Sequence, residues 1–401
     1  MKLIKREKYL NEMINVIGTP DIKVITGIRR SGKSKLLESF KKYVEENIKE
    51  YNIIHINYSL PEFDKLKEYH KLYEYINNNY KKNMNNFVLI DEVQMCDGFE
   101  NAINWIHAEE KYDIYITGSN AFLLSSDLAT LFTGRTFPIE VYPFSFSEFM
   151  KYYEYQDADK VFDEYVFRGG MSGSYVYKEQ KDKYKYIEDV YNTLIIRDIK
   201  KKYNIRNEKI LNNLSNFLMD NISNITSTLN ITKVLNSQEE NITDKTINKY
   251  IGYLCNAFAF YKIGRYDIRG KKYLNSLDKY YVADHSFRYA MLGMTNMDYG
   301  RTYENIVAIE LMRRGYDVYV GTLYNKEIDF VAQKHNEKIY IQVSDNISEE
   351  TAFKREVDSL LKIKDAYPKI LIARTRHDDY TYEGIIIKDI ANWLANDKSE
   401  D

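Results

Sequence analysis

Residues 27–34 read GIRRSGKS, with two glycines, a lysine and a hydroxyl residue at the spacing of a phosphate-binding loop. Gly27 and Gly32 let the backbone curl, so that successive N–H groups point inward at phosphate oxygens. Lys33 can reach the β- and γ-phosphates of a nucleotide, and the hydroxyl of Ser34 can ligate magnesium. The motif therefore predicts a site for ATP and Mg²⁺.

The flanking sequence favours this interpretation over a chance glycine-rich turn. The apolar run at 22–26 precedes the loop, and residues 33–49 follow it with apolar residues at helical spacing. The helix would direct its positive N-terminal end at the same anion. We expect the nucleotide to contact the loop and the start of this helix, namely Gly27, Ile28, Arg29, Arg30, Ser31, Gly32, Lys33, Ser34 and Lys35.

An acidic pair follows a second apolar run, at 87–90, as Asp91 and Glu92. In phosphate-loop enzymes the first acid holds the magnesium shell, so Asp91 joins Ser34 as a predicted metal ligand. The second acid can polarise the attacking water, which makes Glu92 the predicted general base. The alternative is a strand end with two solvated acids, and the preceding phosphate loop favours the catalytic interpretation.

Two further positions could act on the γ-phosphate. The run at 112–117 ends in small polar residues, and Ser119 or Asn120 could orient the water; an ordinary turn explains them equally well. Arg135 precedes another apolar run and could neutralise charge in the transition state, either in its own chain or in a neighbouring subunit. The alternative for Arg135 is a surface ion pair.

The elements that must position these residues alternate between strands and helices. Strands are expected at 22–26, 52–58, 87–90, 112–117 and 137–141, with helices at 1–16, 33–49 and 62–83. Such alternation predicts a doubly wound parallel α/β sheet. In that fold the carboxyl ends of the strands face one crevice, which would bring the candidate residues together.

The rest of the chain divides by its pattern into three regions. Residues 147–204 are expected to be helical, with a break at Gly169-Gly170. Residues 205–290 follow the order helix, turn, helix and hairpin, which is that of a winged helix-turn-helix, with Thr243 and Asp244 capping the last helix. Residues 300–395 return to alternating strands and helices. The predicted domains are 1–144 (ATPase core), 145–204 (helical lid), 205–295 (winged helix-turn-helix) and 296–401 (C-terminal α/β domain).

The winged helix-turn-helix offers basic side chains to a nucleic acid. Lys245 and Lys249 lie one turn apart on the expected recognition helix, and the hairpin carries Arg265, Arg269, Lys271 and Lys272. These residues could contact the phosphates of double-stranded DNA. The alternative is a module that contacts only protein, so DNA binding stays open.

Composition narrows the class of protein. The net charge of −2 gives no overall basic field for nucleic acid. Two cysteines, Cys96 and Cys255, are too few for a disulfide framework and are typical of a reducing compartment. The sequence has no signal-peptide core and no apolar stretch long enough to span a bilayer, so we expect a cytoplasmic protein without a membrane partner.

Together with further segments of the chain, these motifs resemble those of the bacterial and archaeal AAA-type ATPases that carry a C-terminal domain of unknown function. The segments that carry the resemblance are IKREKYL, VITGIRRSGKS, FVLIDEVQ, YITGSNAFLLSSDLATLFTGR, VYPFSFSEF, ENIVAIELMRRGYDVYVG, EIDFVAQ and YIQVS, and they cover nearly the whole chain. The resemblance implies nucleotide roles for Lys33 and Ser34, magnesium binding by Asp91, catalysis by Glu92, and a polar sensor at Ser119 or Asn120.

The same resemblance suggests three more features. It places Arg135 where such proteins reach into a neighbour's site, which implies a homo-oligomer. Arg6 and Glu7 fall where a basic-acidic pair lies near adenine. The segment RGGMSG at 168–173 resembles a Gly-Gly-x-Pro lid motif, although Ser172 stands at the proline position.

The region 300–375 resembles the restriction-endonuclease-like fold, whose active members bind metal through carboxylates and need a lysine two residues after the last acid. Glu304 and Asp329 match the first two acidic positions, whereas the third position reads Gln342-Val343-Ser344. Glutamine is a weaker ligand than a carboxylate for a hard cation, and serine lacks the charge of lysine. We therefore expect that this domain does not cut DNA.

These observations predict Mg²⁺-dependent ATP hydrolysis that drives a conformational change. Coupling to double-stranded DNA or to a protein partner stays open. The alternatives are a nucleotide-gated regulatory module with very slow turnover and an ATP-dependent DNA nuclease.

Overall fold

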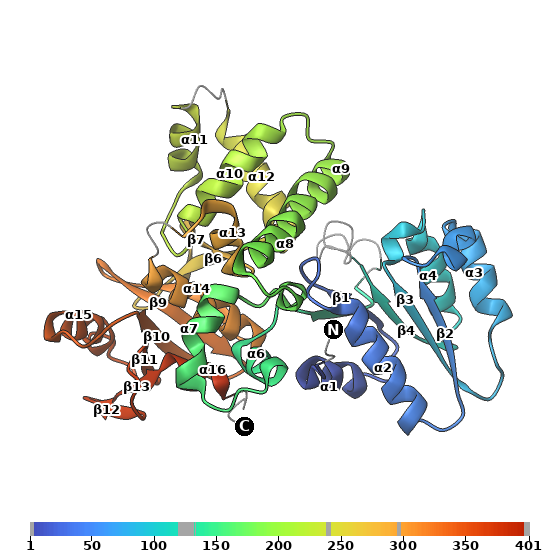
Figure 1. The fold of residues 1–401 in the computed structure, drawn as a ribbon, viewed down its shortest axis with the longest axis horizontal. Helices are drawn as coiled ribbons and strands as arrows, with labels where there is room; N and C mark the ends of the chain where they lie inside the picture. Colours follow the sequence, from blue (N-terminus) through green and yellow to red (C-terminus); the bar gives the residue numbers. More distant parts are fainter. Residues whose placement is uncertain (1–3, 119–131, 133, 238–241, 295–297, 397–401) are drawn as a thin grey trace. The chain divides into compact units, whose positions relative to one another are not determined.

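The structure, a computed structural model, describes residues 4–118, 132, 134–237, 242–294 and 298–396. It divides into two compact units, Met1–Val141 with Asn256–Phe258 and Tyr142–Cys255 with Ala259–Asp401 (Figure 1). Within the described ranges, no helix is both long enough and apolar enough to cross a bilayer.

The first unit is built on a five-stranded parallel sheet with the strand order β2-β3-β4-β1-β5 (Figure 1). Its strands are β1 (Ile22–Thr26), β2 (Tyr51–Asn57), β3 (Asn85–Asp91), β4 (Tyr112–Thr117) and β5 (Thr136–Glu140). Its helices are α1 (Glu7–Asn15), α2 (Lys33–Asn47), η1 (Pro61–Leu66), α3 (Tyr69–Asn78), η2 (Val93–Met95) and α4 (Phe99–Ala108). The expected parallel α/β sheet is thus confirmed.

Burial explains why these segments form the sheet. All five residues of β1 are buried, and so are six of the seven residues of β3, as expected for central strands covered on both faces. On α2 the buried residues Leu36, Leu37, Phe40 and Val44 recur at helical spacing. Because the strands are parallel and in register, their carboxyl ends meet at one edge of the sheet.

Two local expectations differ from the structure. The segment 62–83 is the short η1 followed by α3 rather than one helical region. The stretch between Glu92 and Tyr112, for which we expected no element, contains η2 and α4. Phe99, Ile103 and Ile106 are buried on α4 and give it an apolar face.

The second unit begins with short helical elements and continues into a three-helix group and a large mixed sheet. Its elements are α6 (Phe146–Tyr153), α7 (Ala158–Arg168), η3 (Ser172–Val176), α8 (Gln180–Asn192), η4 (Thr193–Ile199), α9 (Lys200–Tyr203), α10 (Glu208–Asp220), α11 (Thr228–Asn236), α12 (Asp244–Asn256), β6 (Phe260–Asp267), β7 (Lys272–Val282), α13 (Ser286–Leu292), α14 (Tyr299–Arg313), β8 (Asp317–Leu323), β9 (Lys326–Lys334), β10 (Glu337–Ser344), α15 (Glu350–Leu361), β11 (Lys369–Ala373), β12 (Tyr380–Tyr382), β13 (Ile385–Asp389) and α16 (Ile390–Ala395). Thr243 caps α12 as expected, because its hydroxyl accepts a hydrogen bond from the backbone N–H of Thr246.

The hairpin of β6 and β7 differs from the expected free wing. It forms one end of an eight-stranded sheet with the order β12-β13-β11-β10-β9-β8-β6-β7. β6 pairs in parallel with β8, and Tyr266 and Ile268 pack in the same core as Leu323 and Ile328. Burial of this apolar face holds the hairpin against the C-terminal strands. The segments on the two sides of the predicted domain boundary, between residues 295 and 296, therefore share one sheet.

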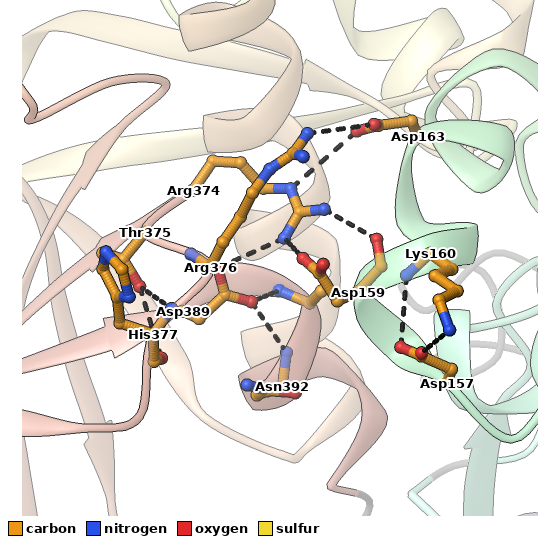
Figure 2. A network of polar contacts seen from close by, with 11 residues as sticks. Asp157, Asp159, Lys160, Asp163, Arg374, Thr375, Arg376, His377, Asp389 and Asn392 are labelled. Carbon is orange, nitrogen blue, oxygen red and sulfur yellow. Dashed lines mark hydrogen bonds and ion pairs between the residues drawn. The ribbon is translucent and has the colours of Figure 1, made fainter.

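The helical lid also contacts the C-terminal strands (Figure 2). The guanidinium of Arg374, which follows β11, lies 2.5 Å from Asp159 and 3.8 Å from Asp163 of α7. The same guanidinium lies 3.3 Å from Asp389 at the end of β13, and the side chain of Arg374 is only 6% exposed. Arg374 and Asp389 of this ion cluster are buried, whereas Asp159 and Asp163 are about half exposed. The cluster connects α7 to the C-terminal sheet within one unit.

Candidate nucleotide-binding site

The loop between β1 and α2 takes a backbone path that requires glycine at two positions. Gly27 has φ +125°, and a Cβ atom there would lie 2.2 Å from the carbonyl oxygen of Val141. Gly32, the residue before α2, has φ +98°. A side chain at Gly27 would therefore clash with backbone atoms, and one at either glycine would strain the loop.

Lys33 lies across this loop. Its ammonium donates hydrogen bonds to the carbonyl oxygens of Gly27, at 2.9 Å, and Ile28, at 3.0 Å, and its side chain is buried. The hydroxyl of Ser31 is also buried, and it has no hydrogen-bond partner among the described residues. Because buried polar groups are normally paired, a cradle with an unpaired hydroxyl fits a phosphate ligand.

Asp91, the last residue of β3, meets the loop through hydroxyl groups. Its carboxylate accepts a hydrogen bond from the hydroxyl of Thr117 on β4, and the hydroxyl of Ser34 on α2 also favours its charged form. Burial raises the pKa of Asp91, while the bonds from Thr117 and Ser34 lower it in part. Hydroxyl and carboxylate oxygens are the ligands that Mg²⁺ prefers, so Ser34 and Asp91 fit the predicted metal site.

Glu92 is half-buried and has φ +57°, a left-handed backbone conformation that is uncommon outside glycine. Its backbone N–H donates to the Thr117 hydroxyl at 3.2 Å, and its carboxylate accepts a hydrogen bond from the side-chain amide of Gln94. Strained residues of this kind gather at functional sites. The position agrees with the predicted general base, but the role stays a prediction.

Three further residues have contacts in this site. The sequence motifs assigned no role to two of them, and the family resemblance alone placed the third near the nucleotide. The hydroxyl of Thr117 donates to the carboxylate of Asp91 and accepts from the N–H of Glu92, and the side-chain amide of Gln94 donates to the carboxylate of Glu92. Both residues lie within the motif-bearing segments, but the motifs assign them no role. Arg6, which the resemblance put near adenine, is buried and donates a hydrogen bond to the carbonyl oxygen of Ser31 at 2.8 Å. Its guanidinium also stacks on the ring of Tyr9 at 4.5 Å.

The remaining loop residues differ in exposure. Ile28 is buried, Arg29 is half-buried, and Arg30 and Lys35 are exposed. Lys35 forms an ion pair with Glu38 at 2.6 Å on the surface of α2. Their predicted nucleotide contacts stay predictions.

The structure describes only one of the remaining predicted catalytic residues. Ser119 and Asn120 lie outside the described residues. Arg135 is exposed and precedes β5, where its carbonyl oxygen accepts a hydrogen bond from the N–H of Ile22, the first residue of β1. Because β1 and β5 are parallel, this is the opposite edge of the sheet from the phosphate loop. A role for Arg135 in its own chain is therefore not supported, and a role in a neighbouring subunit stays a prediction.

The Gly169-Gly170 turn, which resembles a lid motif, packs against Asp284. The N–H of Gly170 donates to the carboxylate of Asp284 at 2.6 Å. A Cβ atom on Gly170 would lie 2.3 Å from the carbonyl oxygen of Phe144, and one on Gly169 would lie 2.3 Å from Asp284. Close packing within the second unit thus accounts for both glycines, and Ser172 of this segment is buried.

The candidate DNA-binding residues are partly exposed. Lys245 and Lys249 on α12 are exposed, and so are Arg269, Lys271 and Lys272 around the hairpin turn, whereas Arg265 donates to the hydroxyl of Thr322 at 3.2 Å. Their contacts with DNA stay predictions.

Comparisons with known families match most of the chain. Residues 19–150 match the family described as an AAA domain. Residues 159–298 match a domain of unknown function (DUF8612), which lies in the middle of the chain rather than at the C-terminal end. The first match agrees with the ATPase core expected from the sequence.

Two solved structures share part of the fold. The Walker-type ATPase of Pyrococcus abyssi is 14% identical with a TM-score of 0.49, over 72% of this chain and 95% of that chain. The AMPPCP-bound DnaA from Aquifex aeolicus is 15% identical with a TM-score of 0.31, over 62% of this chain and 86% of that chain. Because both TM-scores lie below 0.5, the likeness carries no argument about function.

Two relatives match almost the full length. An uncharacterized protein of Methanocaldococcus jannaschii is 27% identical over 97% of this chain and 90% of its own. An uncharacterized protein of Haemophilus influenzae is 38% identical over 98% of both chains. The chain therefore belongs to the family of this Haemophilus influenzae protein, and within it residues 19–150 form an AAA-type ATPase domain.

Proposed function

We propose that the chain binds ATP at residues 27–35 and hydrolyses it, and that hydrolysis drives a conformational change. The observation that carries this proposal is the phosphate loop itself: the buried ammonium of Lys33 bonds the carbonyls of Gly27 and Ile28, and the buried hydroxyl of Ser31 has no partner among the described residues. A chance glycine-rich turn would not need a buried lysine folded back across it.

Each residue has a physical role in the proposed reaction. Backbone N–H groups of the loop bind the phosphates, and the ammonium of Lys33 exchanges the carbonyls of Gly27 and Ile28 for phosphate oxygens. Ser34 and Asp91 would hold Mg²⁺, which when bound neutralises the charge of the phosphates. The carboxylate of Glu92 accepts a proton from the attacking water.

The first experiment compares ATP hydrolysis by the wild type and Lys33→Ala. Lys42→Ala is a matched control, because Lys42 is an exposed lysine on the same helix. We expect turnover in the wild type and in Lys42→Ala, and its loss in Lys33→Ala. An equal rate in Lys33→Ala would assign the turnover to a contaminant or to another site.

A second variant separates an ATPase from a nucleotide-gated module with slow turnover. Glu92→Gln keeps the shape of the side chain but cannot accept the proton. We expect turnover to fall by about a hundredfold or more, with ATP affinity unchanged. If the wild type binds ATP but hydrolyses it no faster than Glu92→Gln, the regulatory module becomes the better description.

Coupling to DNA is a second candidate, favoured by the exposure of Lys245 and Lys249 on one face of α12. The test is ATP turnover with and without double-stranded DNA at several salt concentrations. If α12 contacts phosphates, Lys245→Glu/Lys249→Glu removes any stimulation and reduces the dependence of DNA binding on salt. Stimulation that survives the double variant would assign DNA binding to another surface.

Action of Arg135 in a neighbouring subunit can be tested by mixing two inactive variants. In an oligomer, a Lys33→Ala subunit keeps Arg135 and can complete the site of an Arg135→Ala neighbour. We expect the mixture to recover part of the turnover. Full turnover by Arg135→Ala alone would make Arg135 a surface residue, and an inactive Arg135→Ala that gains nothing in the mixture would contradict action in a neighbouring subunit.

A further inference from the structure

Lys279 is a buried lysine among three carboxylates, of which Glu304 and Asp329 are largely buried and Glu327 is half-buried. It lies in β7, and its side chain is 3% exposed. Its ammonium is 2.8 Å from Glu304 of α14 and 2.6 Å from Glu327 of β9. A third carboxylate, that of Asp329 in β9, lies at 3.8 Å. Nothing in the sequence pattern associates Lys279 with Glu304 and Asp329, because Lys279 precedes the region that resembles a nuclease.

Other groups fix these carboxylates around the ammonium. The hydroxyl of Tyr281 donates to the same oxygen of Glu304 that Lys279 contacts, at 2.7 Å. The backbone N–H of Val343 donates to the second oxygen of Asp329 at 2.8 Å. Glu304 and Asp329 are thus held toward Lys279 by neighbours that belong to separate strands.

The charges explain why the ammonium stays in place. Burial lowers the pKa of Lys279, but the carboxylates of Glu304, Asp329 and Glu327 outweigh this effect and raise it. Burial raises the pKa of Glu304 and that of Asp329, while Lys279 lowers both. An unpaired buried charge is strongly destabilising, so the lysine and the carboxylates require one another.

The ammonium occupies the position that a cation would take among these oxygens. Its distances to Glu304 and Glu327 are those of charge-assisted hydrogen bonds, so these carboxylates converge on one cationic centre. Gln342, at the position of the missing acid, donates its amide to Glu356 of α15 at 2.9 Å. The hydroxyl of Ser344, at the position of the missing lysine, donates to the carbonyl of Asn346 at 3.1 Å.

We infer that Lys279 is a built-in cation that closes the carboxylate site of Glu304, Glu327 and Asp329 to divalent metal. The wild-type C-terminal domain then takes up no metal there. Removing the ammonium while keeping an unbranched side chain that is one atom shorter, as in Lys279→Met, opens a metal site. This inference does not depend on ATP hydrolysis by the first unit.

The test is Mn²⁺ binding to the nucleotide-free full chain, measured by electron paramagnetic resonance. We expect Lys279→Met to bind one more Mn²⁺ per chain than the wild type, and the additional ion to be lost in Lys279→Met/Glu304→Gln. Mn²⁺ should also raise the melting temperature of Lys279→Met more than that of the wild type. Lys262→Met is the matched control, because Lys262 pairs with Asp278 at 2.9 Å near the surface.

Three results would overturn the inference. The first is a folded Lys279→Met that gains no Mn²⁺. The second is a wild-type Mn²⁺ site that disappears in Glu304→Gln. The third is Mn²⁺-dependent DNA cleavage by the wild type that disappears in Lys279→Met, which would make the lysine part of an active nuclease.

A measurement on the wild type decides the question if Lys279→Met does not fold. Amine-reactive labelling followed by mass spectrometry reports whether the ammonium of Lys279 is accessible. We expect Lys279 to stay protected with and without Mn²⁺, while Lys262 is labelled in both. Labelling of Lys279 that rises with Mn²⁺ would mean that the metal displaces the lysine, contrary to the inference.

Discussion

The hydroxyl of Thr117 donates a hydrogen bond to the carboxylate of Asp91. Thr117 ends β4 and Asp91 ends β3, and these neighbouring strands are parallel. The same hydroxyl accepts the N–H of Glu92. One side chain therefore positions both acids of the candidate site.

This contact predicts the effect of Thr117→Val, which keeps the shape of the side chain and removes the hydroxyl. A hydrogen bond to a charged group contributes about 1.5–3 kcal/mol, so we expect ATP turnover to fall by about tenfold or more. Thr19→Val is the control, because the hydroxyl of Thr19 bonds to the carbonyl of Val16, before β1 and away from the loop. Equal rates for both variants would show that Thr117 does not position the acids.

Arg6 predicts an effect on nucleotide affinity. Its guanidinium donates to the carbonyl of Ser31 in the phosphate loop, so Arg6→Ala should loosen the loop and weaken ATP binding by about tenfold. Lys5→Ala removes an exposed neighbouring charge and should leave affinity unchanged. Fluorescence titration with a labelled ATP analogue measures both. Unchanged affinity in Arg6→Ala would limit this residue to supporting the fold of the first unit.

The substitution Gly170→Ala is expected to destabilise the second unit strongly. Ala at this position would push its Cβ against the carbonyl of Phe144 and against Asp284, so the free energy of unfolding should fall by at least about 2 kcal/mol. A Trp105→Phe background leaves Trp393, in the second unit, as the fluorescent reporter of urea unfolding.

Gly252→Ala is the control for this loss. Gly252 lies in α12 with open space around its Cβ position, so alanine should stabilise the helix by up to about 1 kcal/mol. If Gly170→Ala is no less stable than Gly252→Ala, the packing at Asp284 contributes little.

His285 predicts a dependence of stability on pH. Burial lowers the pKa of His285, although Asp284 opposes this effect, and the ring nitrogen Nε2 lies 3.1 Å from the carbonyl oxygen of Tyr165. A histidine with a lowered pKa in the folded state stabilises the fold fully above its unfolded-state pKa of about 6.5. As the pH falls below that value, stability decreases by up to about 1.4 kcal/mol per pH unit, until the folded-state pKa is reached.

Urea unfolding at several pH values between about 7.5 and 5, on both sides of the unfolded-state pKa of about 6.5, measures this decrease. His285→Gln should lose part of the decrease, whereas the exposed His377→Gln should keep all of it. Identical pH profiles for the wild type and His285→Gln would mean that other groups control the acid sensitivity.

Local sequence pattern was sufficient for the core of the candidate site. The phosphate loop, the two acids after β3 and the alternating strands depend on short-range features, namely glycine spacing, apolar runs and helical periodicity. Once the strands are known to be parallel, their carboxyl ends must share an edge, which brings Lys33, Ser34 and Asp91 together. The sequence therefore determined the parallel sheet and the residues that face its crevice.

Long-range packing decided what the sequence left open. The hairpin of β6 and β7 has the pattern of a free wing, but β6 pairs with β8, more than fifty residues later in the chain. Lys279 meets Glu304 and Asp329 through the sheet that this pairing builds, and Gly170 contacts Asp284 because the predicted lid packs on the rest of the second unit. Strand pairing and buried ion pairs join residues that are distant in sequence. Their contribution depends on which groups are removed from water together in the folded chain, and no local sequence pattern predicts that.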